Sequence, residues 1–179
     1  MERCIIRSPT GAELVRLAEL EEAADRRYLD TGHPELATTN GIDAATARRL
    51  AAADRLAVAV TSTDELAGFV AWFIEDDPTY LGISQVSVAP EHGGRGVGTA
   101  LMHHAIAAAR AGGFCAVVLN TQLDVEWNAP WYERLGFAVV PPERWTGWMR
   151  TCAEEQAADG ISWAARCWME LPLGPTQQR

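Results

Sequence analysis

Four glycines, Gly93, Gly94, Gly96 and Gly98, lie just before a helical pattern in the middle of the chain. Glycine lets the backbone turn tightly and lets a ligand approach without interference from a Cβ atom. The first amides of the following helix have no partner inside the helix, and they carry the positive end of its dipole. These residue types at this spacing favour an anion such as a pyrophosphate.

The kind of anion site is narrowed by what this glycine-rich loop (residues 93–98) lacks. Loops that bind nucleoside triphosphates end in Gly-Lys-Ser/Thr, whereas Gly98 is followed by Thr99 and Ala100, with no lysine nearby. A dinucleotide-binding loop needs glycine or alanine three residues beyond its second glycine, where this chain has Thr99 or Leu101. Both nucleotide classes match poorly, and a glycine-rich turn without a ligand remains the alternative.

The elements around the loop determine where such a site would lie. The sequence predicts a strand over residues 80–89, a helix over 96–111 and a second strand over 114–121. A strand-helix-strand crossover makes its two strands parallel neighbours, and ligands bind at the carboxyl ends of such strands. We therefore expect the anion site at that edge of the sheet.

The rest of the chain alternates between strand and helix patterns. Further strands are predicted at residues 4–7, 56–61, 66–75, 137–140 and 162–170, and further helices after Thr10 and at 43–53, 128–135 and 144–158. This order indicates an α+β fold with a mixed sheet covered by helices. No repeat or linker divides the chain, so we expect a single domain over residues 1–171 and a flexible tail over 172–179.

Composition excludes several classes of protein. The net charge of -9 argues against binding to a nucleic-acid backbone, which needs clustered lysine and arginine. No apolar run is long enough to span a bilayer, and the first residues lack the apolar part of a secretory signal. We therefore expect neither a membrane nor a nucleic-acid partner, and a cytoplasmic protein.

Cysteine and histidine spacing gives no support to a metal site. The four cysteines lie far apart without a Cys-x-x-Cys pair, and we expect free thiols; Cys115 and Cys167 lie in apolar strand-like runs, where cysteine acts as a small hydrophobic residue. The adjacent His103 and His104 point about 100° apart on a helix, so they cannot share a metal ion.

Two segments, in this order, resemble the GNAT superfamily of N-acetyltransferases, which transfer an acetyl group from acetyl-CoA to an amine. Residues 86–98 are similar to the family's pyrophosphate loop, Arg/Gln-x-x-Gly-x-Gly/Ala, with Gly96 and Gly98 as its two small residues. Residues 128–137 are similar to its aromatic-Tyr-x-x-x-Gly-Phe segment. The resemblance implies a mostly antiparallel sheet of six to seven strands flanked by helices, with a parallel strand pair at the CoA site.

The resemblance also implies acetyl-CoA as co-substrate and assigns residues to it. The residues expected to contact CoA are Val86, Val88, Gly93, Gly94, Arg95, Gly96, Val97, Gly98, Thr99 and Asn128. Tyr132 occupies the position of the family's tyrosine, and we expect it to act as the general acid that protonates the leaving thiolate.

Three positions depart from the family pattern. They affect the assignment of the catalytic groups more than the assignment of the cofactor. Gly93 replaces the loop's Arg or Gln, Val125 replaces an asparagine, and Gln85 replaces a glutamate on the preceding strand. An alkyl ammonium must lose a proton before it attacks a thioester, which costs roughly 4 kcal/mol at pH 7. Gln85 cannot accept that proton as a carboxylate can, so Gln85 and Glu75 remain candidates for a proton relay or for substrate contacts, with a solvated turn as the alternative for Glu75.

The function expected from the resemblance is acetyl transfer to a primary amine, of a small molecule, by direct attack on the thioester. The alternatives are a CoA-binding sensor or partner module without turnover, and a protein or peptide N-acetyltransferase. Acceptor recognition is expected from residues 30–43 and 141–158. Trp127, Trp145 and Trp148 could form a cation-π wall for an ammonium group, although core packing is the more common use of tryptophan. The sequence leaves the oligomeric state open, a homodimer included.

Overall fold

A computed structural model describes residues 4–38, 41–74 and 79–174 of the chain. Its strands are β1 (Cys4–Arg7), β2 (Leu56–Thr61), β3 (Leu66–Ile74), β4 (Tyr80–Val88), β5 (Ala116–Gln122), β6 (Ala138–Val140) and β7 (Arg166–Pro172). Its α-helices are α1 (Gly11–Leu14), α2 (Leu17–Asp25), α3 (Ala44–Ala52), α4 (Val97–Ala111), α5 (Ala129–Arg134) and α6 (Gly147–Ala158). The short 3-10 helices are η1 (Arg26–Asp30), η2 (Pro34–Thr38), η3 (Pro90–His92) and η4 (Pro142–Arg144).

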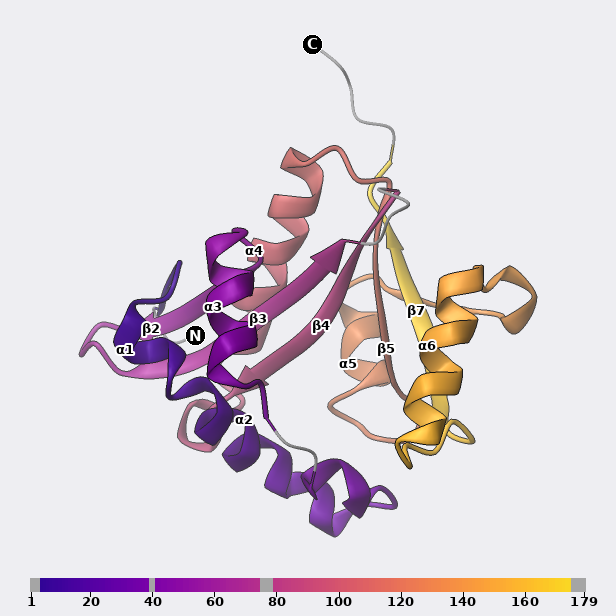
Figure 1. The fold of residues 1–179 in the computed structure, drawn as a ribbon, viewed down its shortest axis with the longest axis horizontal. Coiled ribbons are helices and arrows are strands. Elements are labelled where there is room, and N and C mark those ends of the chain that lie inside the picture. Colours follow the sequence, from indigo (N-terminus) through magenta and orange to yellow (C-terminus); the bar gives the residue numbers. More distant parts are fainter. Residues whose placement is uncertain (1–3, 39–40, 75–78, 175–179) are drawn as a thin grey trace.

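The strands form one seven-stranded sheet in the order β1-β2-β3-β4-β5-β7-β6 (Figure 1). Among the strand pairs of the described residues, β4 with β5 is parallel and the others are antiparallel. This arrangement confirms the predicted fold class and the predicted parallel pair on either side of α4. The pair is parallel because α4 carries the chain back across the sheet before β5 begins.

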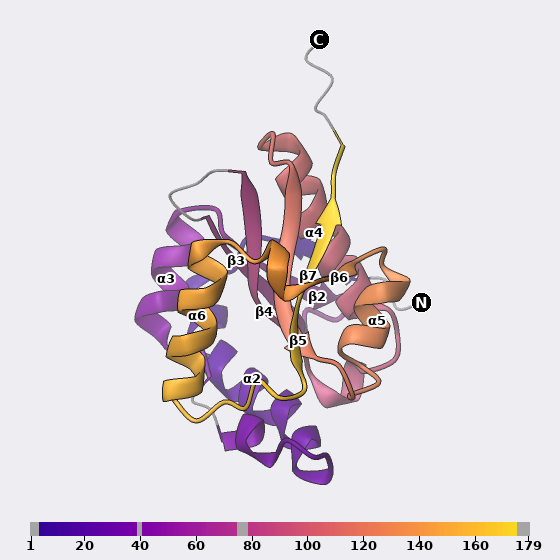
Figure 2. The same ribbon diagram turned by 90° about the vertical axis from the view of Figure 1, so that its right-hand side faces the viewer.

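Helices cover both faces of the sheet, with α4 and α5 on one face and α3 and α6 on the other (Figure 2). The first core lies under α4, whose Leu101, Met102 and Ala105 are fully buried against the sheet. The second core lies on the opposite face, where apolar residues of α1 to α3 such as Leu17 contact β2 and β3. A third cluster, around Trp168, packs under α6. Both faces of the sheet are therefore apolar, and each packs against its own layer of helices.

The two parallel strands separate soon after they pair. Their register joins Tyr80–Gly82 to Ala116–Val118 and goes no further. The register of β3 with β4 shifts where Ala71 pairs with Gln85 and Trp72 pairs with Ile83, so β4 carries an extra residue at this point. Such a bulge bends a strand and increases its twist. The carboxyl-terminal halves of β4 and β5 thus diverge, as Figure 1 shows.

Element boundaries differ from the predictions at a few places. The last strand begins at Arg166 and not at residue 162, because Trp163 lies in a turn and packs on Trp145 and Trp168 at 5.4 Å and 6.0 Å between ring centroids. Cys115 is exposed, because it precedes the first residue of β5, while Cys167 is buried as expected. The predicted tail falls largely on residues 175–179, which lie outside the described residues.

The described part of the chain has no helix that combines the length and apolar character needed to cross a membrane. Among the same residues, no three His, Cys, Asp or Glu side chains are grouped so that they could hold a metal ion.

Candidate functional site

A cavity of about 1140 Å³ lies where β4 and β5 diverge. Its floor is formed by residues 83–86 and 88 of β4 and by residues 119–122 of β5. Its walls come from α2 and η1 on one side and from α5, the start of α4, α6 and Arg166 around the rest. The cavity therefore lies at the carboxyl ends of the parallel pair, where the sequence predicted a ligand site.

The glycine-rich loop opens into this cavity. Gly94 and Gly96 have φ of +68° and +86°, in the left-handed region that residues with a Cβ rarely adopt. Gly96 is the N-cap of α4, no side chain caps this end, and the first turn holds no acidic residue. The first helical bond runs from the Ala100 amide to the Gly96 carbonyl at 3.0 Å. The amides before Ala100 therefore have no partner within the helix and are available to an anion.

Most of the residues predicted for the site line the same cavity. They are Gln85, Val86, Val88, Gly93, Gly94, Gly96, Val97, Gly98, Thr99, Asn128 and Tyr132. Arg95 is not among the lining residues. Glu75 lies outside the described residues. The amide Nε2 of Gln85 donates to Ser87 Oγ at 3.0 Å.

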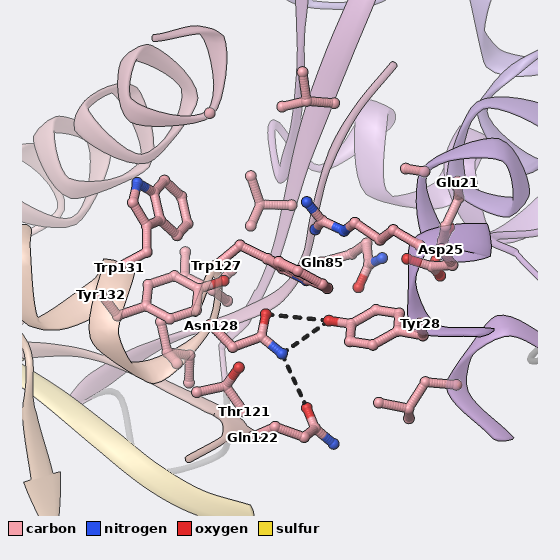
Figure 3. A pocket seen from close by; sticks show the side chains of 18 of the residues that line it. Glu21, Asp25, Tyr28, Gln85, Thr121, Gln122, Trp127, Asn128, Trp131 and Tyr132 are labelled. Atoms are coloured by element: carbon pink, nitrogen blue, oxygen red, sulfur yellow. Dashed lines mark hydrogen bonds between the residues drawn. The ribbon is translucent and has the colours of Figure 1, made fainter. Parts of the chain in front are cut away.

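Tyr132 projects from α5 toward the centre of the cavity (Figure 3). Its side chain is 8% exposed and packs between Trp131 and Phe137, at 4.7 Å and 5.8 Å between ring centroids. Burial raises the pKa of its phenol above the ordinary value. Tyr132 therefore keeps its proton at neutral pH and can donate it.

Asn128 joins η1 to the segment that runs from the end of β5 to the start of α5 (Figure 3). The Tyr28 hydroxyl donates to Asn128 Oδ1 at 3.1 Å, and Asn128 Nδ2 lies 2.9 Å from the same hydroxyl. Asn128 Nδ2 also lies 3.3 Å from Gln122 Oε1, to which it donates. This network ties η1 to the end of β5 and the start of α5, and all three residues line the cavity. The contact with Tyr28 was not predicted, because the two residues are 100 positions apart.

Two carboxyl groups of α2, Glu21 and Asp25, line the cavity and were not predicted as site residues (Figure 3). Burial raises the pKa of Glu21 to about 7, against a hydrogen bond of 2.8 Å from the Ile42 amide that lowers it. Burial also raises the pKa of Asp25 to about 6. Neither forms an ion pair with a described residue within 4.0 Å. The available signal was that Glu21 lies on the same helix side as Leu14 and Leu17, where a carboxylate is out of place.

The three tryptophans considered for a cation-π wall divide into two groups. Trp127 lines the cavity, 5.0 Å from the guanidinium carbon of Arg27 and 6.0 Å from the Tyr28 ring. Trp145 and Trp148 instead pack in the cluster under α6. Trp127 therefore already has a cation of the protein over its ring, and the other two have core roles.

Comparison with known proteins agrees with this geometry. The family model described as Acetyltransferase (GNAT) family matches residues 12–137. One similar solved structure is N-acetylglutamate synthase from Neisseria gonorrhoeae with coenzyme A and N-acetyl-glutamate, with a TM-score of 0.71 and 15% identity over 97% of this chain and 36% of that chain. This chain thus spans little more than a third of the length of the Neisseria protein.

Two other similar structures have nearly the length of this chain. Ard1 from Thermoplasma volcanium has a TM-score of 0.66 and 16% identity, over 94% of this chain and 97% of that chain. A GNAT family acetyltransferase from Brucella melitensis, in complex with acetyl-CoA, has a TM-score of 0.59 and 19% identity over 100% and 94%. At these identities the likeness establishes the fold. Because the family match spans most of the sequence and the fold agrees with it, the chain belongs to the GNAT acetyltransferase family.

Proposed function

We propose that the protein is an acetyl-CoA-dependent N-acetyltransferase that moves the acetyl group to a primary amine of a small molecule. The observation that carries this proposal is one cavity with two chemically different ends. Uncapped amides of α4 open into it from one side, and the carboxyl groups of Glu21 and Asp25 reach it from α2. The first end suits the phosphates of CoA, and the second suits an ammonium group.

The residues present fit acetyl-CoA. The left-handed glycines Gly94 and Gly96 bring the backbone close to a ligand, and a Cβ built on Gly94 would meet no atom within 4 Å. The divergence after Gly82 leaves the facing backbone groups of β4 and β5 outside their parallel ladder, so an extended pantetheine arm can hydrogen-bond to them. Gly93 provides no side chain to the phosphates, and the backbone amides would provide the binding energy.

The chemistry needs one proton acceptor and one proton donor. The ammonium of the acceptor gives a proton to Glu21 or Asp25, whose raised pKa values lie near neutrality, as a general base requires. The nitrogen lone pair then forms the N–C bond with the thioester carbonyl, and the C–S bond breaks. The departing thiolate takes a proton from the Tyr132 hydroxyl, and the second proton lost by the nitrogen restores Tyr132. The products are the N-acetyl amine, CoA as the thiol and one proton held by the carboxylate.

A CoA-binding module without turnover is the main rival, since Gln85 replaces a carboxylate on β4. Glu21 and Asp25 offer replacement carboxylates in the same cavity, and this favours turnover. The enclosing walls of α2, η1 and α6 favour a small acceptor over a folded protein.

Two measurements test the proposed function. Calorimetry should show that acetyl-CoA binds, and a thiol-release assay should show CoA production with at least one member of a panel of small amines, aminoglycosides and peptides. Turnover should rise with pH through about 7, because the carboxylate must be ionised to accept a proton. Binding without thiol release from any amine would establish the non-catalytic rival, and release with peptides alone would establish the protein acceptor.

A further inference from the structure

Arg166 is a half-buried cation in the cavity, and the described residues give it no anionic partner. It begins β7 and lines the cavity, and no carboxylate of the described residues lies within 4.0 Å of it. Its Nε donates to Asn120 Oδ1 at 2.7 Å, and its guanidinium lies 5.8 Å from the Trp163 ring. These two contacts hold the plane of the guanidinium. Among the described residues, its two terminal nitrogens have no hydrogen-bond acceptor.

Gln122 places a second unused donor beside this cation. The residue is 2% exposed and lines the cavity, and its buried Nε2 has no hydrogen-bond partner among the described residues. Its other amide atom, Oε1, is engaged by Asn128 at 3.3 Å, which fixes the orientation of the group. Gln122 and Arg166 are direct partners across β5 and β7, so their side chains emerge on the same face. The pair therefore offers only unused donors, the Arg166 guanidinium from the cavity wall and Gln122 Nε2 from a buried position beside it.

These donors face the side of the sheet opposite to the glycine-rich loop. Along β7, Cys167 packs under α4 and α5, whereas Trp168 packs under α6. Because side chains alternate along a strand, Arg166 faces the α6 side with Trp168. Figure 2 shows α4 and α6 on opposite faces of the sheet. The phosphates of CoA, bound at the start of α4, are thus poor candidates for the anion that Arg166 lacks.

We propose that the acceptor amine also carries a carboxylate, which Arg166 and Gln122 bind while Glu21 and Asp25 receive its ammonium group. The substrate class is thereby narrowed to amino acids and related zwitterions. This inference rests on the proposed function, since it assigns the acceptor end of the same cavity.

The charges of the acceptor region support a zwitterion over a polycation. A buried guanidinium left without a partner is costly, and a purely cationic acceptor would add repulsion to that cost. A carboxylate instead accepts from the guanidinium in bidentate geometry, and a third hydrogen bond can come from Gln122 Nε2. The carboxyl groups of α2 lie on the other wall of the cavity, so both ends of a zwitterion meet an opposite charge.

Matched substrates isolate the role of the carboxylate. Amino acids of several chain lengths are compared with their primary amides and with the amines that lack the carboxyl group, in the thiol-release assay. The wild-type protein should favour the carboxylate member of a set by roughly 10- to 100-fold in kcat/KM, the range expected for hydrogen bonds to a charged group.

Variants of the pair then assign that preference to its residues. Arg166→Met should remove the preference by raising KM for the carboxylate member alone, and Arg166→Lys should retain part of it. Gln122→Glu should weaken the preference as well, because it gives Arg166 a carboxylate partner within the protein. Arg48→Met, on the exposed surface of α3, is the matched control and should behave as wild type.

A binding measurement separates failure of this inference from failure of the proposed function. CoA-loaded protein is titrated with N-acetyl amino acids and with their amides, so no turnover is needed. Tighter binding of the carboxylate form, lost in Arg166→Met with unchanged acetyl-CoA affinity, supports the inference even without catalysis. If Arg166→Met binds acetyl-CoA itself more weakly, the arginine is assigned to the cofactor and the inference is overturned. Equal affinity of the wild-type protein for the N-acetyl amino acids and for their amides would also overturn it.

Discussion

Replacing Glu21 with glutamine should make the protein more stable and less active, each for a known reason. The amide matches the carboxylate in size and can still accept the 2.8 Å hydrogen bond from the Ile42 amide. It removes the charge that burial disfavours. The rise in pKa from 4.5 to about 7 corresponds to about 3 kcal/mol at 1.36 kcal/mol per pKa unit. We expect about 2 kcal/mol of this in Glu21→Gln, since part of the side chain remains exposed and the amide also loses hydration.

The direction in which the stability of the folded protein changes with pH follows from the raised pKa of Glu21. The folded-state pKa of Glu21 is raised, so the folded protein binds the extra proton more strongly than the unfolded chain between pH 4.5 and about 7. Wild-type stability therefore falls as pH rises through this window, and Glu21 adds no further slope above it. The Glu21→Gln variant lacks this contribution. The two proteins should differ little near pH 5 and most above pH 7.5.

Urea unfolding at pH 5 and pH 8.5 measures this difference directly, and the melting temperature at pH 8.5 should rise by roughly 4 to 8 °C. Glu19→Gln, at an exposed position of the same helix, is the matched control and should not reproduce the pH-dependent gain. Turnover of Glu21→Gln should fall at least tenfold if Glu21 accepts the proton. A variant that is destabilised at pH 8.5, or shifted equally at both pH values, would refute the claim that a buried charge at Glu21 costs stability.

Two further substitutions test the other end of the cavity. Tyr132→Phe should lower kcat by roughly 10² or more and leave acetyl-CoA affinity unchanged, because it removes the proton donor alone; near-normal turnover would exclude the general-acid role. Gly96→Val should weaken acetyl-CoA binding at least tenfold by calorimetry, because valine is strained at a φ of +86° and crowds the first amides of α4. Gly113→Val, at a φ of +77° beyond the other end of α4, carries similar strain and should lose stability without loss of binding; equal weakening in both variants would contradict a direct contact at Gly96.

Much of the fold could be predicted because its signals are local. Thr10 and Asp43 cap helices as their types suggest, Thr10 in a capping box with Glu13. Alternation and apolar runs located the strands, with errors confined to their ends. The start of β7 was misplaced because Trp163 is apolar enough to extend a strand pattern, yet it packs as part of a turn. Only the packing of Trp163 against Trp145 and Trp168 shows that it belongs to the turn and does not extend the strand.

The site was predictable only in part, because only some of its residues belong to local sequence motifs. The glycine-rich loop and the Tyr132 segment are contiguous motifs, so their residue types were enough to indicate a cofactor site. Glu21, Asp25 and Arg166 belong to elements at the two ends of the chain, and no short pattern relates them. Their burial, and hence the pKa shifts of the carboxyl groups, exists only after the chain has folded around them.

The sequence by itself determined where the backbone can turn left-handed, which faces of the helices are apolar, and that a free helix N-terminus follows the loop. These properties depend on each residue and its immediate neighbours. The tertiary structure determined which side chains share a cavity with that helix N-terminus. The bulge in β4 and the divergence of β4 from β5 opened the cavity, and the register of β5 with β7 placed Gln122 beside Arg166. Such placements depend on long-range strand pairing, which brings side chains from distant parts of the sequence into one cavity.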